Sequence, residues 1–287
     1  MRRERVADDI YVFTSERYAQ VTAGAVLSSE GAALIDTLLY PSETRQIKQF
    51  IEGRLGCPVR YVINTHYHAD HTYGTYLFPE ATVIAHVRCA ELLEQRGCES
   101  IAQARAAQRE FAEVRLVLPR LLIDESPFHL RLGNKTLLMW HTPGHTLDSI
   151  VCLVREERVL FAADTIMALP HFVDGDYEAH LSTLERLQHN NFESIVQGHG
   201  EVILRGEIEE KLQSDIAYLR AVRKHAEIAL TKDDPYGYLQ SVDIEHCGKS
   251  RVLLNGIAEQ LHRANLFALF ERLRKAEQIA SQQTETN

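Results

Sequence analysis

The sequence predicts an α/β fold followed by a helical C-terminal segment. Short apolar runs rich in β-branched residues alternate with segments of helical spacing as far as about residue 205, and beyond it only the helical spacing recurs. Hydrophobic residues make up 45% and charged residues 25% of the 287 residues, which is ordinary for a globular protein. We therefore expect a main domain over residues 1–205 and a helical extension over residues 206–287.

The first half of the chain is expected to open with an antiparallel meander, because turn-forming residues separate three apolar runs. These runs are residues 10–13, 21–27 and 32–36. Pro41 then begins a helix that reaches about residue 55. A further strand over residues 59–63 is rich in Val and Ile.

The second half continues the alternation of helices and strands. Helical spacing predicts helices over residues 86–96 and 100–113, and apolar runs predict strands over residues 128–132, 136–140, 149–154 and 159–162. Two helical stretches follow residue 205, with a turn predicted at residues 233–237. These C-terminal helices could simply bury their apolar stripes, form a lid over a site, or serve a dimer.

The residues directly after the strand at 59–63 form a metal-binding pattern. His66 and His68 are two apart on an extended segment, so their side chains point the same way and can share one ion. If a helix begins after Ala69, Asp70 and His71 can aim at a second point beside the first. Histidine nitrogen and carboxylate oxygen suit zinc and also accommodate iron, manganese or cobalt. The alternative is a capping aspartate flanked by solvent-exposed histidines.

Three further candidate ligands follow strand ends later in the chain. His145 lies in His-Thr-Pro-Gly-His-Thr, Asp164 ends an apolar run, and His199 lies in Gln-Gly-His-Gly. Neighbouring Gly and Pro residues permit tight turns from which a side chain projects at the edge of a sheet. Each signal is weak alone, but their order along the chain is informative.

Taken together, these motifs resemble those of the metallo-β-lactamase-fold hydrolases over roughly residues 8–205. The resemblance implies a four-layer αββα sandwich of two mixed sheets, with two ions held by loops at one edge. The implied ligands are His66, His68 and His145 for one ion and Asp70, His71 and His199 for the other, with Asp164 bridging both. Asp36 would orient the ligand loops rather than bind metal, although a strand-end aspartate can also simply cap a turn.

Asp164 narrows the resemblance within the family. Class B1 β-lactamases carry Cys at this position, whereas a bridging carboxylate resembles the glyoxalase II, lactonase and phosphodiesterase branches. The segment after Asp164 lacks the glycine-rich continuation of glyoxalase II itself. The chain is therefore expected to be glyoxalase II-like without being a close match to glyoxalase II.

The expected function is dinuclear metal-dependent hydrolysis of a small ester, thioester, lactone or related substrate. Two zinc ions, or iron or manganese, would hold a bridging hydroxide as the nucleophile, and Asp70 would orient it or accept its proton. His171 and Tyr177 follow Asp164 closely and could contact the substrate, or could be a plain loop histidine and a packed tyrosine. Two alternatives stay open: a persulfide dioxygenase-like oxidoreductase with one iron, and a non-catalytic, metal-stabilised binding or regulatory protein.

The composition of the chain limits which partners and which cellular compartment we expect for it. The net charge of −9 argues against a nucleic-acid binder. The charged N-terminal residues lack the apolar stretch of a signal peptide, and no long apolar run follows. The five cysteines show no C-x-x-C spacing and predict no disulfide framework. We expect a cytoplasmic protein that acts on a small molecule, contacts neither membrane nor nucleic acid, and could form a homo-oligomer.

Overall fold

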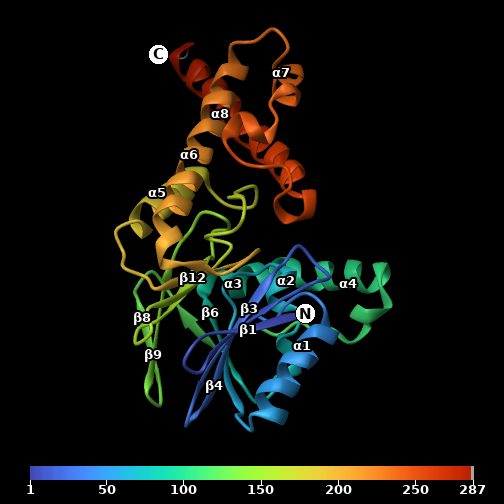
Figure 1. Cartoon of the computed structure of the whole chain (residues 1–287). Coiled ribbons are helices and arrows are strands. Elements are labelled where there is room, and N and C mark those ends of the chain that lie inside the picture. The colour runs from blue at the N-terminus through green and yellow to red at the C-terminus, as the bar shows by residue number, and fades with distance from the viewer. Residues whose placement is uncertain (286–287) are drawn as a thin grey trace.

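A computed structural model describes residues 1–285 of the chain and shows two β-sheets with helices on their outer faces (Figure 1). The first sheet has seven strands in the order in which they occur along the chain: β1 (Arg2–Ala7), β2 (Ile10–Thr14), β3 (Thr22–Ser28), β4 (Gly31–Ile35), β5 (Val59–Ile63), β6 (Thr82–His86) and β7 (Leu121–Ile123). Strands β1 to β4 pair antiparallel and β4 to β7 pair parallel, so this sheet is mixed.

The second sheet has six strands in the order β13-β12-β11-β10-β9-β8. They are β8 (Phe128–Leu132), β9 (Lys135–His141), β10 (Ile150–Val154), β11 (Val159–Ala163), β12 (Ser194–Gln197) and β13 (Ile203–Leu204). Only β11 and β12 pair parallel, so this sheet is also mixed. An isolated bridge between Val21 and His199 ties the loop after β12 to the start of β3.

The helices are distributed over the two outer faces and the edge that carries the connecting loops. They are α1 (Pro41–Lys48), α2 (Ala69–Thr72), α3 (Val87–Leu92), α4 (Cys98–Ala107), α5 (Tyr177–Leu187), α6 (Arg205–Leu230), α7 (Pro235–Ser241) and α8 (Ala258–Glu285). Short 3₁₀ and π segments complete the set: η1 (Gln49–Arg54), η2 (Thr75–Leu77), η3 (Leu93–Gly97), η4 (Arg109–Glu113), η5 (Ile244–Cys247) and η6 (Leu253–Gly256).

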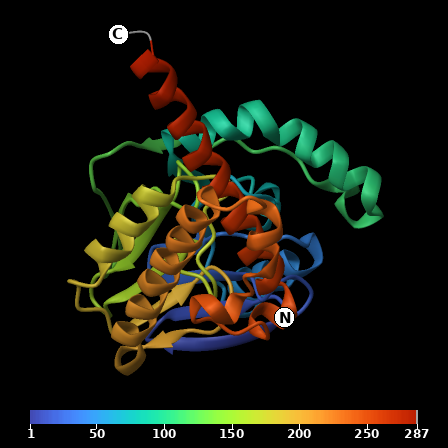
Figure 2. The ribbon, with the colours of Figure 1, turned by 90° about the horizontal axis from the view of Figure 1, so that it is seen from above.

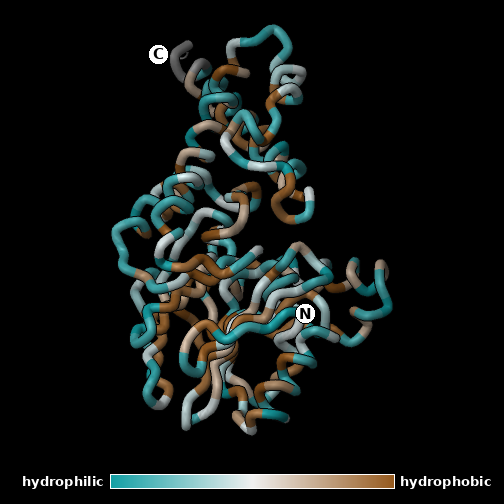
Figure 3. Tube along the Cα trace, in the orientation of Figure 1, coloured by the Kyte–Doolittle hydropathy of each residue, from teal (hydrophilic) through white to brown (hydrophobic). Residues whose placement is uncertain are grey.

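Three apolar clusters define four layers. Side chains from both sheets, such as Ile63 and Phe161, meet in a central cluster. A second cluster joins the outer face of the first sheet to α1 through residues such as Ile47. A third joins the outer face of the second sheet to α5, α6 and α8, with Leu219 and Leu266 among its members. This arrangement confirms the αββα fold class, and Figure 3 shows the hydrophobic colouring concentrated along the packed strands.

The C-terminal helices share one core with the second sheet and also rise above it. Figures 1 and 2 show that α6 and α8 run side by side above the sheets. The turn that contains η6 lies at the lower end of this pair, above α2 and α3. The helical character predicted after residue 205 is confirmed as far as Glu285; residues 286–287 of the predicted extension lie outside the described residues. None of the described helices combines the length and apolar character that crossing a lipid bilayer requires.

Several element predictions are corrected by the structure. Strands β1, β6, β7 and β13 were not predicted. β1 is mostly charged, and β7 and β13 have only three and two residues, whereas β6 is a mostly apolar run of five residues that was overlooked. The helix expected over residues 100–113 is broken at Gln108, whose φ of −145° is extended, so that Phe111 on η4 can pack in a small cluster with Tyr73. The turn expected at residues 233–237 is in part a helix, because the Asp234 side chain accepts a hydrogen bond from the Gly237 amide and begins α7.

Candidate metal centre

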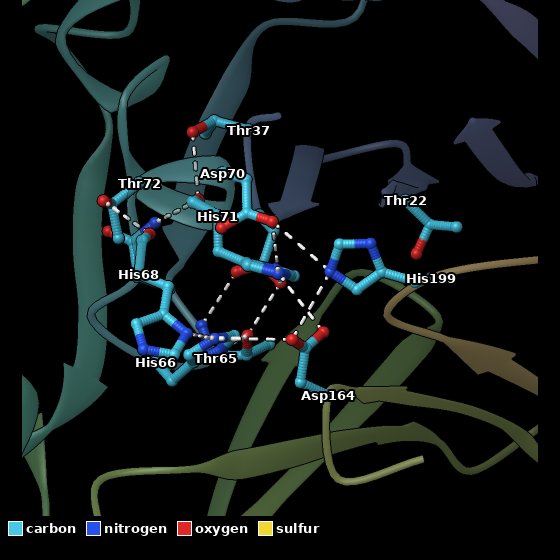
Figure 4. Close-up of polar contacts among 12 residues, drawn as sticks. Thr22, Thr37, Thr65, His66, His68, Asp70, His71, Thr72, Asp164 and His199 are labelled. Carbon is cyan, nitrogen blue, oxygen red and sulfur yellow. Dashed lines mark hydrogen bonds and ion pairs between the residues drawn. The ribbon is translucent and has the colours of Figure 1, made fainter. Parts of the chain in front are cut away.

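The loop between β5 and α2 delivers four polar side chains to one edge of the sandwich (Figure 4). His66 and His68 lie on the extended part of this loop, whereas Asp70 and His71 belong to the first turn of α2. The change from an extended to a helical backbone therefore splits the six-residue motif between two neighbouring points. This is the split that the sequence predicts.

The first candidate ion position is surrounded by three imidazole nitrogens and one carboxylate. His68 Nδ1 lies 3.1 Å from His66 Nε2 and 3.1 Å from His145 Nε2. Asp164 Oδ2 lies 3.2 Å from His145 Nε2 and 3.9 Å from His66 Nε2. These four side chains form one of the groups whose ligand atoms are close enough to share an ion.

The second point is formed by Asp70, His71 and His199. His199 Nε2 lies 3.3 Å from Asp70 Oδ2, and His71 Nε2 lies 3.7 Å from the same oxygen. Asp164 also reaches this group, because its Oδ1 is 3.3 Å from His71 Nε2 and its Oδ2 is 3.4 Å from His199 Nε2. Asp164 thus stands between the two groups, as a bridging ligand would.

The outer nitrogens of the five imidazoles face other protein groups. The Nδ1 atoms of His145 and His199 donate to the carbonyls of His171 and Ala19 at 2.8 and 2.9 Å. Because a carbonyl can only accept, these rings carry their proton on the outside, and in the neutral ring the inner nitrogen keeps its lone pair. His71 Nδ1 faces Asp36 Oδ2 at 2.8 Å.

The remaining two rings are held in the same manner. His66 Nδ1 lies 3.1 Å from Thr65 Oγ1, and His68 Nε2 lies 3.3 Å from Asp174 Oδ2. The fit to metal ions is supported by His71 Nε2 and Asp164 Oδ1, which are buried 3.3 Å apart and make no well-formed hydrogen bond with any of the described residues. Buried polar atoms normally find a partner, so atoms left free in the centre of a ligand cluster suit cations.

Burial and charge shift the pKa values at this centre in opposite directions. Burial lowers the pKa of His145 to about 3. Burial alone would lower the pKa of His199, but Asp164 and Asp70 outweigh it and raise the value to about 10. Burial alone would raise the pKa of Asp70, but His71 and His199 outweigh it and hold the value at about 2. Ionised carboxylates therefore create a negative field in which a proton and a divalent cation compete.

Strained backbone surrounds the ligands. Asp36 and Ala163 have φ values of 58° and 44°, in the left-handed region that non-glycine residues seldom adopt. Ala163 directly precedes Asp164, and a Cβ atom on Gly198 would lie 1.9 Å from Asp164 Oδ1. The bridging carboxylate thus occupies the space that a side chain at position 198 would need. Such strain persists where the surrounding structure holds a functional geometry.

The structure brings together all seven predicted ligands and places Asp36 beneath them. Asp36 accepts hydrogen bonds from the amide and the hydroxyl of Thr65 at 2.8 and 2.7 Å, in addition to facing His71. Sequence reasoning missed Asp174, which contacts His68 from the loop after β11. An aspartate in a turn sequence gives no signal by itself, because only the folded loop brings it to the ring.

The two predicted substrate contacts have different outcomes. His171 lines the cavity above the metal centre. Tyr177 does not line it: the ring is 2% exposed, packs against Phe172, and its hydroxyl donates to the Leu219 carbonyl. Of the two possibilities for Tyr177, the substrate contact is therefore wrong and the packed tyrosine is what the structure shows, because α5 turns this side chain toward α6 and away from the ligands.

A third group of candidate ligands, His86, Glu125 and His141, lies apart from the centre. The two imidazoles stack at 4.1 Å with an interplanar angle of 13°. Two rings stacked in parallel direct their lone pairs along parallel lines, so they do not converge on one ion. His141 also donates from Nε2 to the Leu147 carbonyl at 2.9 Å. This geometry favours a structural role for His86 and His141.

A cavity of 440 Å³ opens directly over the metal centre. Its floor includes His68, Asp70 and Asp164, and its walls come from the loop before β3, from the α3–α4 region and from the C-terminal helices. A cavity of this size holds a small organic molecule.

A comparison with known protein families shows to which family the chain belongs. The pattern described as the metallo-beta-lactamase superfamily matches residues 18–207, which include every residue of the two ligand groups. The chain belongs to the metallo-beta-lactamase superfamily. A solved structure titled as a metallo-beta-lactamase from Pontibacter korlensis covers 76% of this chain and 98% of its own, with a TM-score of 0.62 and 19% identity.

Two curated members of the superfamily are similar in sequence. The "Beta-lactamase-like protein 2 homolog" of Caenorhabditis elegans is 25% identical over 176 residues, which are 59% of this chain and 54% of that protein. The human "Acyl-coenzyme A thioesterase MBLAC2" is 26% identical over 207 residues, 63% of this chain and 70% of that protein. The chain spans about half the length of the first curated relatives that it matches.

Proposed function

We propose that the chain is a metal-dependent hydrolase with two divalent ions, most suitably zinc, that cleaves a small ester, thioester or lactone. The observation that carries this proposal is the division of seven ligands into two adjoining groups that share Asp164. His66, His68 and His145 would hold one ion, and Asp70, His71 and His199 the other. The thioesterase named among its relatives supports the same class of reaction.

Bound at these positions, the ions would lower the pKa of a water molecule and polarise the carbonyl of the substrate. The side chains of the protein supply the rest of the chemistry. Asp70 has a pKa of about 2 because His71 and His199 outweigh the effect of burial. It therefore stays ionised at neutral pH and is placed at the cavity floor to orient the attacking water and accept its proton.

His171 has two roles in this proposal. Its carbonyl fixes the ring of His145, and its imidazole lines the cavity. Burial lowers the pKa of this imidazole to about 4, so the ring is neutral at pH 7 and can donate one hydrogen bond to a substrate oxygen. No serine or cysteine nucleophile is required.

The second group of ligands favours the hydrolase over the two alternatives. A persulfide dioxygenase-like enzyme uses one iron and would leave Asp70, His71 and His199 without a common ion. A non-catalytic binding protein would not need an ionised aspartate at the floor of an open cavity. Both alternatives are nevertheless distinguishable by experiment.

Metal content and turnover test the proposal together. Protein loaded with zinc is expected to retain about two equivalents per chain by elemental analysis and to hydrolyse members of a thioester, ester and lactone panel. Asp70→Asn should reduce kcat by roughly 10²- to 10⁴-fold, whereas the exposed control Asp233→Asn should leave it unchanged.

Three results would contradict the proposal. One equivalent or none per chain rules out the dinuclear centre. Oxygen uptake with glutathione persulfide on iron-loaded protein, without ester or thioester hydrolysis, favours the oxidoreductase. Full activity in Asp70→Asn removes the proposed role of this carboxylate and favours the binding protein.

A further inference from the structure

The cavity over the metal centre has an apolar wall contributed by the C-terminal extension. Leu254 of η6, Leu261 of α8 and Ile257 between these two elements line it on one side. Ile101 and Leu116 line it from the α4–η4 region. Ile257 is 38% exposed, and together with the other apolar side chains it forms a continuous apolar lining on one side of this cavity. The wall would suit an alkyl chain.

The turn that presents this wall is conformationally strained. Leu254 and Asn255 have φ values of 52° and 56°, and Gly256 has a φ of 91°. Leu254 is nevertheless only 3% exposed, because the turn directs its side chain inward, whereas Val252 of the same segment is 75% exposed. A left-handed backbone at two non-glycine residues in succession is costly and indicates that the rest of the structure holds this shape.

Two arginines, Arg96 and Arg115, lie on the same cavity, and neither pairs with a carboxylate within the described part of the chain. Arg96 donates from Nη1 to the hydroxyl of Tyr67 at 2.9 Å, beside the ligand His68. Arg115 is exposed, and among the described residues it has no hydrogen-bond or ion-pair partner. In a chain with 40 acidic and 31 basic residues, an unpaired guanidinium at a cavity is a strong attraction for an anion.

The geometry points to an amphiphilic anion as the substrate: an acyl thioester or ester with an alkyl chain of medium length and a carboxylate or phosphate group. The alkyl chain lies against Leu254, Ile257 and Leu261, and Arg115, assisted by Arg96, binds the anionic group. This inference rests on the proposed hydrolase function and specifies its substrate class. In the reaction, water adds to the carbonyl carbon, the C–S or C–O bond breaks, and the products are a carboxylate and a thiol or alcohol. One proton of the water passes to the leaving sulfur or oxygen, and the other is released to solvent.

Two thioesters with the same acyl chain test the role of Arg115. S-octanoyl mercaptopropionate carries a carboxylate, and S-octanoyl-N-acetylcysteamine is neutral. The wild-type enzyme should prefer the anionic thioester, and Arg115→Ala should raise its KM for that substrate by at least about tenfold, since a hydrogen bond to a charged group is lost. The KM for the neutral thioester should stay within about twofold.

Arg120→Ala is the matched control, because Arg120 is an exposed arginine of the same segment that does not line the cavity. The ethyl monothioester of suberic acid, which carries its carboxylate at the far end of the acyl chain, determines which end of the substrate Arg115 binds. Dependence on Arg115 in either anionic substrate supports the inference. Equal behaviour of Arg115→Ala and Arg120→Ala toward both overturns it.

Chain-length dependence tests the apolar wall. Ile257→Ala should reduce the ratio of kcat/KM for octanoyl over butyryl thioesters by about tenfold, because apolar contacts with the longer chain are lost. Val252→Ala, on the same turn but outside the cavity, should leave the ratio unchanged. An unchanged ratio in Ile257→Ala overturns the assignment of the wall.

Calorimetric binding separates this inference from the hydrolase proposal. S-octyl mercaptopropionate is a thioether and cannot be hydrolysed. If it binds the metal-loaded wild-type protein at least about tenfold more tightly than Arg115→Ala while no thioester is cleaved, the cavity binds an amphiphilic anion through Arg115 as inferred, but the hydrolase proposal fails. If thioesters are cleaved but the thioether binds both proteins equally, the hydrolase proposal stands and the inference fails.

Discussion

Asn265 on α8 is expected to control metal binding although it contacts no ligand. Its side chain is fully buried. Nδ2 donates to the Pro170 carbonyl at 2.7 Å and to the Tyr218 hydroxyl at 3.1 Å, and Oδ1 accepts from the Phe172 amide at 3.3 Å. These bonds fix the backbone on either side of His171, and the His171 carbonyl in turn accepts the hydrogen bond that orients the ring of His145. Asn265→Ala would release that carbonyl.

The magnitude follows from the groups that lose a partner. Asn265→Ala leaves the buried Pro170 carbonyl and Phe172 amide unpaired, at about 1–3 kcal/mol each. We expect the free energy of unfolding to fall by about 3 kcal/mol in total. A ligand that loses its supporting hydrogen-bond partner typically weakens metal affinity by roughly 10- to 100-fold. One of the two ions should therefore bind more weakly while the other is little affected.

Urea unfolding and metal competition with a chromophoric chelator measure the two effects. Arg263→Ala is the control, because Arg263 is exposed on the same helix and, among the described residues, its side chain bonds only to Glu259, at 3.2 Å. The control should change stability by less than about 0.5 kcal/mol. If Asn265→Ala is destabilised but binds both ions with wild-type affinity, Asn265 merely attaches the extension, and the reasoning through His171 is refuted.

Two further predictions concern buried groups near the centre. Asp36→Asn should weaken metal affinity by roughly 10- to 100-fold through the loss of the carboxylate that faces His71, and unchanged affinity in the same chelator assay would contradict this role. His86 has a pKa lowered to about 4, mainly by burial. The unfolded chain therefore takes up a proton at a higher pH than the folded chain does, and stability is lost as pH falls from the ordinary histidine pKa toward 4. The free energy of unfolding should decrease by about 2 kcal/mol more in the wild type than in His86→Asn between pH 7 and pH 5. Asparagine is chosen because the His86 side chain caps α3 by accepting a hydrogen bond from the Arg88 amide at 3.2 Å, and asparagine can do the same. If the free energy of unfolding measured in urea depends on pH in the same way for the wild type and for His86→Asn, this prediction is refuted.

The local pattern of the sequence was sufficient to predict most of the central strands. The runs that became β2 to β5 and β8 to β11 are apolar and rich in β-branched residues, so their propensity and their burial agree. Strand β1 was missed because its sequence, Arg-Arg-Glu-Arg-Val-Ala, is mostly charged; it forms by pairing with β2 at the edge of the sheet. Its stability depends on the partner strand rather than on its own composition.

The sequence by itself determined the fold class and the chemical character of the centre. The spacing of His66 to His71 and the turn residues around His145, Asp164 and His199 are local features, and each loop needs only its own residues to project a ligand. The tertiary structure decided which groups support the centre. Asp174, the His171 carbonyl and Asn265 acquire their positions from contacts between segments far apart in the chain. No periodicity in the sequence records such contacts, because they depend on how whole layers pack against each other.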